Sequence, residues 1–215
     1  MPGRNLKEIK GEPLVGIAIR QAQNAEQIDE IVVNTDDEGI RMVAEEYEID
    51  IYDRPDRFAE RDRMMEVDRL LSWQVHELED KGHTIDIIVV LYPTSPLRTI
   101  ETIDETVKKV TEDGHDSALS LYEDNRYLWQ KKNGTVSPKN YDPQVRGPKH
   151  LEEWNQWVET KAVYATKREI LISHGSRLAG DIGYVEMPRH RSINIDTRMD
   201  FELARFIAEV DGASW

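Results

Sequence analysis

The sequence predicts an α/β fold in which a mostly parallel sheet is flanked by helices. Short apolar runs rich in β-branched residues alternate with stretches of 3.6-residue periodicity through the first half of the chain, as in a βαβα order. The chain has 215 residues, of which 39% are hydrophobic and 33% charged, enough for one substantial core. We therefore expect one domain over residues 1–215.

The first elements follow a break at Gly11-Glu12-Pro13. Helical periodicity begins after this break and predicts a helix over residues 14–25. The run EIVVN at residues 30–34 predicts a buried strand, and the acidic residues after it predict the start of a helix over residues 37–47. Residues 49–52 are a weaker strand candidate.

The middle of the chain carries the clearest strand. Apolar residues from Met64 to Leu78 recur at helical spacing, which predicts a long amphipathic helix that ends near residue 82. The run IDIIVVL at residues 85–91 is apolar on both faces, and we expect it at the centre of a parallel sheet. A crossover helix at residues 100–112 and a strand at residues 117–121 should follow.

Residues 123–158 interrupt this rhythm with Asn, Gly, Pro and Lys, and they carry Trp129, Trp154 and Trp157. The tryptophans can form a small satellite core or an interface, since aromatic residues are enriched at buried contacts. The sequence leaves both interpretations open. Regular structure is expected again in four later segments, at residues 161–165, 167–173, 183–187 and 201–210.

Composition excludes several classes of function. The net charge of −14 argues against non-specific nucleic-acid binding, because phosphate backbones require a surplus of Lys and Arg on one face. The absence of cysteine leaves oxygen and imidazole as metal ligands, which favours magnesium over zinc. No apolar run approaches the roughly 20 residues needed to cross a bilayer. We expect a cytoplasmic protein that does not bind a membrane.

The most informative motif, LYPTSPLR at residues 91–98, follows the strongest strand, where ligands bind in open α/β sheets. Hydroxyls, free backbone amides and one guanidinium can contact a substrate there. The candidate substrate-binding residues are Tyr92, Pro93, Thr94, Ser95 and Arg98. From the residues alone, the structural interpretation is favoured, namely a rigid strand-to-helix turn in which Arg98 caps local structure.

A second motif is SINIDT at residues 192–197. Its period of two places Ile193 and Ile195 on one face and the polar residues on the other. Oxygen atoms from Asn194 and Asp196 on one face suit Mg²⁺ shared with a substrate phosphate. The alternative is a polar strand edge followed by a helix cap.

These motifs resemble those of the CMP-sialic acid synthetase family, the acylneuraminate cytidylyltransferases. The resemblance covers nearly the whole chain in order. Its matching elements are PGRN at residues 2–5, GEPL at 11–14, TDDE at 35–38, Arg54-Pro55, LYPTSPLR at 91–98, AVY at 162–164, SINIDT at 192–197 and Asp200-Phe201. The resemblance implies a Rossmann-like nucleotidyltransferase domain in which residues 123–158 form a small inserted element for dimerisation near the sugar.

The resemblance also implies roles for individual residues. Arg4 and Asn5 correspond to a pair that meets the triphosphate and the nucleoside, and Arg54 to an arginine on the cytosine-nucleotide side. The turn at residues 91–98 borders the sugar, and Asp196 matches the second of two aspartates that hold Mg²⁺. The implied reaction is attack by a sugar's anomeric hydroxyl on the α-phosphorus of CTP, with release of pyrophosphate. Arg4 and Asp196 would be the catalytic residues.

The sequence departs from the family in three places. The family begins with an apolar strand and an RxGSKG-like loop that cradles the triphosphate, whereas Met1 here falls just before the PGKN-like segment. Asn194 stands where the first metal-binding aspartate is expected. On the sugar side, Thr160-Lys161 replaces Asn-Gly, and Tyr92 replaces a glutamine. We therefore expect little activity from this chain until a strand and loop of this kind are added before it.

Three functions remain open at this point. The first is a homodimeric enzyme that transfers CMP from CTP to a nine-carbon acidic sugar such as sialic, legionaminic or pseudaminic acid. The second is a homologue that binds nucleotide, sugar or a partner without turnover. A 3-deoxy-octulosonate cytidylyltransferase is the third, disfavoured by the SINIDT and ETKAVY strings.

Overall fold

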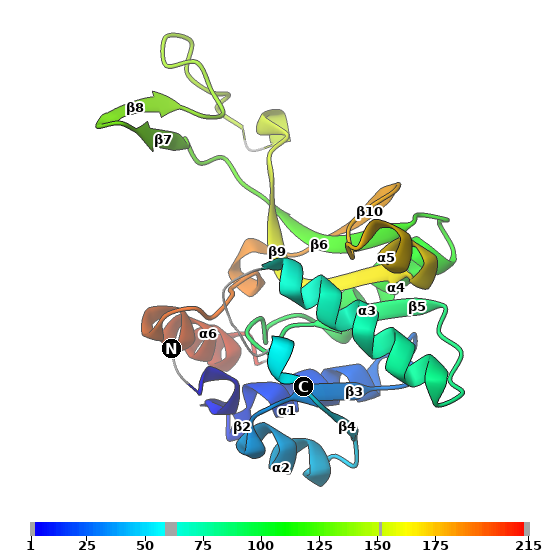
Figure 1. The fold of residues 1–215 in the computed structure, drawn as a ribbon. Helices are drawn as coiled ribbons and strands as arrows, with labels where there is room; N and C mark the ends of the chain where they lie inside the picture. The colour runs from blue at the N-terminus through cyan, green and yellow to red at the C-terminus, as the bar shows by residue number, and fades with distance from the viewer. Residues whose placement is uncertain (1–2, 59–63, 151, 213–215) are drawn as a thin grey trace.

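The computed structural model describes residues 3–58, 64–150 and 152–212, shown as a ribbon in Figure 1. Six α-helices lie in this part of the chain. They are α1 (Leu14–Asn24), α2 (Glu38–Glu46), α3 (Met64–Asp80), α4 (Ile100–Thr111), α5 (Arg168–His174) and α6 (Arg198–Val210). Short 3-10 helices lie at η1 (Arg4–Leu6), η2 (Asp56–Phe58), η3 (Glu152–Trp154) and η4 (Arg189–Arg191).

The main sheet has four strands in the order β10 (Ile182–Glu186), β6 (Ser117–Glu123), β9 (Trp157–Lys167) and β5 (Ile87–Leu91). Strand β10 is parallel to β6, and β9 is antiparallel to both β6 and β5. Three of the four strands therefore run in one direction, with β9 reversed between β6 and β5. The expectation of a mostly parallel α/β sheet is confirmed.

Two layers of helices cover this sheet. On one face, Val107 and Val110 of α4 pack against Ala118 and Ala165 of the central strands. On the other face lie α3 and α5, which are joined by a bidentate ion pair between Arg168 and Glu79 at 2.7 and 2.9 Å. Successive residues of a strand point to opposite faces, and because helices cover both faces, residues 162–166 of β9 are all buried.

A separate two-stranded sheet is formed by the parallel strands β3 (Val32–Thr35) and β4 (Asp50–Asp53). Helix α1 packs its Val15 and Ile19 against this pair and against α2. Helix α3 reaches the same pair from the other side, where Gln74 accepts a hydrogen bond from Asn34 at 2.8 Å. Both helices therefore bridge the small sheet and the main sheet.

The position of β5 differs from the sequence expectation. The run at residues 85–91 was expected at the centre of the sheet, but within the described residues β5 is the end strand and is paired on one side, with β9. All five of its residues are partly exposed. The strand was recognised correctly, but the centre of the sheet is occupied by β6 and β9, and β5 pairs with β9 in the antiparallel sense.

Residues 124–156, which we call the arm, project away from the domain where β6 and β9 continue past the sheet (Figure 1). The arm contains a hairpin that the sequence reading missed, β7 (Trp129–Lys132) and β8 (Thr135–Pro138). Tyr127 contacts both Tyr141 and Trp154 edge to face, with ring centroids 4.5 and 4.9 Å apart. The arm thus has a small aromatic core of its own.

The base of the arm is fixed by the wholly buried carboxylate of Asp124. Arg126 donates to both of its oxygens at 2.9 and 2.7 Å, and Arg189 of η4 lies 3.7 Å away. Gln156, on the returning strand of the arm, donates to the same carboxylate at 3.3 Å. This cluster joins both strands of the arm to the domain.

The N-terminal segment runs through η1 into a small hairpin of β1 (Glu8–Ile9) and β2 (Glu12–Pro13). Lys10 and Gly11 form its turn with positive φ angles of 54° and 81°, as a type I′ turn requires. Ile9 is fully buried against residues of α1 and α6, so the N-terminal segment lies beside the last helix (Figure 1). None of the helices in the described ranges is long and apolar enough to span a membrane.

Candidate active site

The turn that follows β5 is buried and held by one arginine. Thr94, Ser95 and Arg98 are 5%, 1% and 2% exposed. Nη1 of Arg98 donates to the carbonyl oxygens of Tyr92, Ser95 and Ala162 at 2.8, 3.0 and 3.0 Å. Burial lowers the pKa of Arg98 to about 9, so the guanidinium is charged at neutral pH. These contacts correspond to the structural interpretation of Arg98.

The turn also contacts the SINIDT segment, one hundred residues away in the sequence. The hydroxyl of Thr94 donates to Oδ1 of Asn194 at 2.8 Å, and that of Ser95 approaches the same oxygen at 3.5 Å. The backbone amide of Ile195 donates to the carbonyl of Thr94 at 2.7 Å. Ile195 is fully buried, which anchors the segment while its polar neighbours face the turn.

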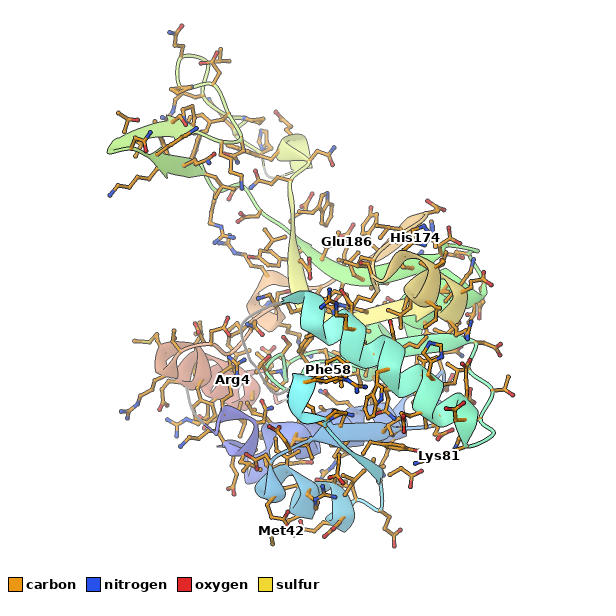
Figure 2. The ribbon with its side chains drawn as sticks, viewed as in Figure 1. Arg4, Met42, Phe58, Lys81, His174 and Glu186 are labelled. Carbon is orange, nitrogen blue, oxygen red and sulfur yellow. The ribbon has the colours of Figure 1, made fainter. Side chains whose placement is uncertain are left out.

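Asp196 joins this group to the N-terminal segment. Nη1 of Arg4 lies 2.7 Å from its Oδ1, and Nδ2 of Asn194 donates to its Oδ2 at 2.7 Å. Arg4 donates also to the carbonyl of Ile195 at 3.1 Å. The side chains of Arg4, which is labelled in Figure 2, and of Asp196 are 38% and 58% exposed, so a ligand can reach both.

Helix α6 begins directly after this group with a capping box. The hydroxyl of Thr197 accepts from the amide of Asp200, while the carboxylate of Asp200 accepts from the amides of Asp196 and Thr197. Burial alone would raise the pKa of Asp200, but the hydrogen bonds from Thr197 and Asp196 outweigh it and hold the pKa below its usual value. The helix start therefore fixes the backbone at Asp196.

Asp196 and Asn194 carry oxygen atoms of the kind that Mg²⁺ prefers, and Nδ2 rather than Oδ1 of Asn194 now faces the Asp196 carboxylate. Asp196 offers one exposed carboxylate, and Asn194 adds an amide oxygen that faces the hydroxyls of Thr94 and Ser95. Mg²⁺ is commonly held in this way by one or two carboxylates and phosphate oxygens. In the part of the chain that the structure describes, no group of three or more acidic or histidine side chains forms a dedicated metal cage.

The other expected nucleotide-binding residues lie outside this group. Arg54 follows β4, where it donates from Nε and Nη2 to the side chain and backbone oxygens of Asn34 at 3.3 and 3.1 Å. Asp36 lies 3.9 Å from its Nη1. Oδ1 of Asn5 in η1 is buried without a partner among the described residues. Met1 and Pro2 of the expected N-terminal motif lie outside the described residues.

Tyr92 and Pro93 lead from β5 into the turn. The Tyr92 ring is half-buried and meets the ring of Tyr164 edge to face, with centroids 5.9 Å apart. Behind these rings lies Arg177, paired with Asp68 of α3. The sequence reading missed Asp68 and Arg177, although Asp68 interrupts the apolar stripe of α3 and such a charge signals a buried partner.

Residues 1–180 match the model of a protein family described as cytidylyltransferase. N-acylneuraminate cytidylyltransferase A of Danio rerio is 28% identical over 208 residues, which cover 95% of this chain and 46% of that protein. Pseudaminic acid cytidylyltransferase of Campylobacter jejuni is 22% identical over 224 residues, covering all of this chain and 93% of that protein. The chain thus spans about half the length of its relatives from fish.

Solved structures agree on the fold. A CMP:2-keto-3-deoxy-manno-octonic acid synthetase complexed with CTP has a TM-score of 0.67 at 13% identity, over 98% of this chain and 93% of that one. A 4-diphosphocytidyl-2C-methyl-D-erythritol synthase has a TM-score of 0.71 at 10% identity, over 95% and 92% of the two chains. The family match covers most of the sequence, and both structures have the nucleotidyltransferase fold expected from it. This chain belongs to the cytidylyltransferase family.

Proposed function

We propose that this protein transfers CMP from CTP to the anomeric hydroxyl of a nine-carbon acidic sugar of the sialic, legionaminic or pseudaminic type. The observation that carries the proposal is the meeting of three distant segments at the end of β5. They contribute Arg4, the Thr94-Ser95 hydroxyls and the Asn194-Asp196 pair. The names of the relatives support an acidic sugar as acceptor. A cytoplasmic location belongs to the same proposal, since CTP is the donor.

In the proposed reaction, the hydroxyl oxygen forms a bond to the α-phosphorus and the bond from that phosphorus to the bridging oxygen breaks. Pyrophosphate leaves, and the hydroxyl proton is released. Arg4 can hold a phosphate oxygen by a charge-assisted hydrogen bond, since its guanidinium is partly exposed. Arg54 is assigned to contacts with the nucleotide. The turn formed by residues 92–98 is assigned to contacts with the sugar. Positioned donors of this kind typically supply several kcal/mol of transition-state stabilisation.

Mg²⁺ is the proposed cofactor, held by Asp196 and Asn194, and when bound it neutralises negative charge on the phosphates. Exchange of Asn194 for Asp tests this assignment, since Asn194 Nδ2 now lies 2.7 Å from the Asp196 carboxylate. Two carboxylates at that separation repel unless a cation lies between them. Asn194→Asp should therefore strengthen Mg²⁺ binding, measured by calorimetry with CTP present. Weaker binding in Asn194→Asp, or unchanged binding in Asp196→Ala, would show that the metal lies elsewhere.

The reaction itself is tested by pyrophosphate release and by detection of the CMP-sugar product. CTP is offered with a panel of nine-carbon acids and with 3-deoxy-octulosonate, first to the 215-residue chain and then to a form with a family-like strand and glycine-rich loop before residue 1. Product with a nine-carbon acid in either form supports the proposal. CTP binding without product from both forms would instead indicate a binding protein.

The proposal includes a homodimer that forms through the arm. Trp129, Val136 and Val145 of the arm are 50%, 62% and 78% exposed in the single chain. Trp154 and Trp157 are half-buried, the former against Tyr127 and the latter against Tyr184. The aromatic core of the arm thus accounts for Trp154, and a contact with β10 accounts for Trp157, while the exposed group is available to a second copy. We expect a dimer by light scattering at micromolar concentration and a shift to monomer in Trp129→Lys; a monomeric parent protein would contradict this.

A further inference from the structure

Arg177 is a buried cation outside the group around Asp196. It lies between α5 and β10, where Gly175 ends α5 with a left-handed φ of 62° and turns the chain back. Arg177 is 4% exposed, and its Nη1 lies 2.7 Å from Oδ1 of Asp68. The Asp68 side chain is itself only 15% exposed. The two residues join the loop after α5 to α3, across the end of the sheet.

The guanidinium of Arg177 also lies over two tyrosine rings. Its central carbon is 4.7 Å from the ring centroid of Tyr164 and 5.8 Å from that of Tyr92. Both distances fall within the range of cation–π attraction, about 6 Å. Burial raises the pKa of both hydroxyls, and the positive charge of Arg177 opposes this rise. The arginine therefore interacts electrostatically with both rings.

The two rings are not equally constrained by hydrogen bonds. The hydroxyl of Tyr164 donates to the carboxylate of Glu159. The hydroxyl of Tyr92 is buried and has no partner among the described residues. Only the Tyr164 ring, the Arg177 charge and general packing thus hold the Tyr92 ring in place. Tyr92 stands where β5 enters the turn, two residues before Thr94, whose hydroxyl donates to Asn194.

Stability alone does not account for such a pair. Two buried charges are expensive to desolvate, and a buried ion pair can often be replaced by apolar residues with no loss of stability. Nε of Arg177 is moreover buried without a partner among the described residues, which adds to the cost. An apolar side chain would fill this space at lower cost but could not orient the rings by charge.

We propose that Arg177 is a positioning residue for the acceptor. Held by Asp68, it fixes the half-buried Tyr92 ring against Tyr164, so that this ring forms a fixed wall at the start of the turn for the carbon skeleton of the sugar. This inference rests on the proposed function, because it assigns the space beside Tyr92 to an acidic sugar. It predicts that loss of the Arg177 charge weakens acceptor binding and leaves CTP binding unchanged.

The test compares Arg177→Met, Arg177→Lys and Arg168→Met with the parent protein. Arg168 is a matched control, because it pairs with Glu79 on the same helix α3 but contacts neither ring. CTP is titrated by calorimetry, and N-acetylneuraminic acid is titrated into protein saturated with CDP. We expect Arg177→Met to weaken sugar binding by about tenfold, Arg177→Lys to restore part of it, and Arg168→Met to leave it unchanged.

A second measurement needs no sugar. In protein labelled with ¹³C in its tyrosine rings, Arg177→Met should shift the NMR signals of Tyr92 and Tyr164, and Arg168→Met should not. A lower melting temperature in Arg177→Met with unchanged sugar affinity would overturn the inference, as would equal losses for sugar and CTP. If the parent protein binds CTP but no acidic sugar, the proposed function fails. Ring signals that respond to Arg177→Met would in that case still support positioning of the rings by Arg177. Unchanged ring signals would overturn the positioning inference as well.

Discussion

Strands β5 and β9 lie side by side in the main sheet, yet their environments differ. Strand β5 is apolar throughout, but all five of its residues remain partly exposed. Strand β9 contains Thr160, Lys161 and Thr166, and nevertheless Ala162, Val163 and Ala165 are fully buried. The difference lies in pairing, since β9 has partners on both sides and β5 has one within the described residues. Burial in this sheet is thus determined by neighbouring strands more than by composition.

The largest effect is expected from adding a strand beside β5, because β5 would then have partners on both sides, as β9 does. A strand placed beside the free side of β5 would satisfy its backbone groups and cover Ile87–Leu91. If that strand is followed by a glycine-rich loop, the loop adds donors for the triphosphate, and even one such donor is worth roughly a hundredfold in rate. We expect the N-terminally extended form described above to release pyrophosphate at least about a hundredfold faster than the 215-residue chain.

A control separates the strand from the loop. An extension with the same strand but a serine-rich loop of equal length should raise the melting temperature without most of the gain in rate. Equal rates for the 215-residue chain and the extended form would contradict the prediction, and β5 would then be complete as an edge strand.

The second prediction compares one valine from each strand. Val163 and Val89 pack in the same cluster under α4, but Val163 is fully buried and Val89 is not. Val163→Ala should cost about 2.5 kcal/mol, from two lost methyl groups and a cavity, and Val89→Ala about 1 kcal/mol. Urea unfolding measures both losses of stability, from the shift in the midpoint of the transition when the dependence of the unfolding free energy on urea is unchanged. In the extended form the cost of Val89→Ala should approach that of Val163→Ala, and equal costs already in the shorter chain would contradict the comparison.

Local sequence signals predicted the elements of the fold well. β-Branched runs gave the positions of the strands, and helical spacing gave the helices to within a few residues at most ends. The Asn133-Gly134 dipeptide, with φ angles of 49° and 80°, also signalled the missed hairpin of β7 and β8, because a type I′ turn favours these residues. The order of the strands was not predictable in this way, since an apolar run does not specify how many partners it has.

For the candidate site, too, local motifs predicted some residues, while contacts between distant segments were not predictable. The family motifs identified Arg4, Thr94, Ser95, Asn194 and Asp196, and these residues lie together. For Arg98 the sequence favoured a structural role, and its burial and its hydrogen bond to the carbonyl of Ala162 support that interpretation. The pairing of Arg177 with Asp68 joins residues 109 positions apart, and no local pattern specifies a partner at that distance.

The smallest expected effect concerns the far ends of the two strands. At the end of β9, the carboxylate of Asp116 accepts from the amide of Asp181 at 3.0 Å and pairs with Lys167 at 2.9 Å. The hydrogen bond from Asp181 and the charge of Lys167 hold the pKa of Asp116 below its usual value. At the matching end of β5, the backbone of Asp86 accepts from the amide of Arg168, a contact that does not titrate.

Protonation of Asp116 should therefore loosen the end of β9, whereas the backbone hydrogen bond at the end of β5 contains no group that titrates. Because the pKa of Asp116 is lower in the folded protein, its stabilisation is complete above the ordinary aspartate pKa of about 3.9 and is lost as the pH falls through the lower folded value. Asp116→Asn should lower the urea midpoint at pH 7, by less than Val89→Ala does, and the difference from the parent protein should shrink below about pH 3.9 and vanish below the folded pKa of Asp116. Amide hydrogen exchange shows where the structure loosens in the variant. We expect faster exchange at Lys167 and Asp181 and an unchanged rate at Arg168. A midpoint difference that persisted in acid would mean that Asp116 acts through the shape of its side chain, and the two strand ends would then be equivalent.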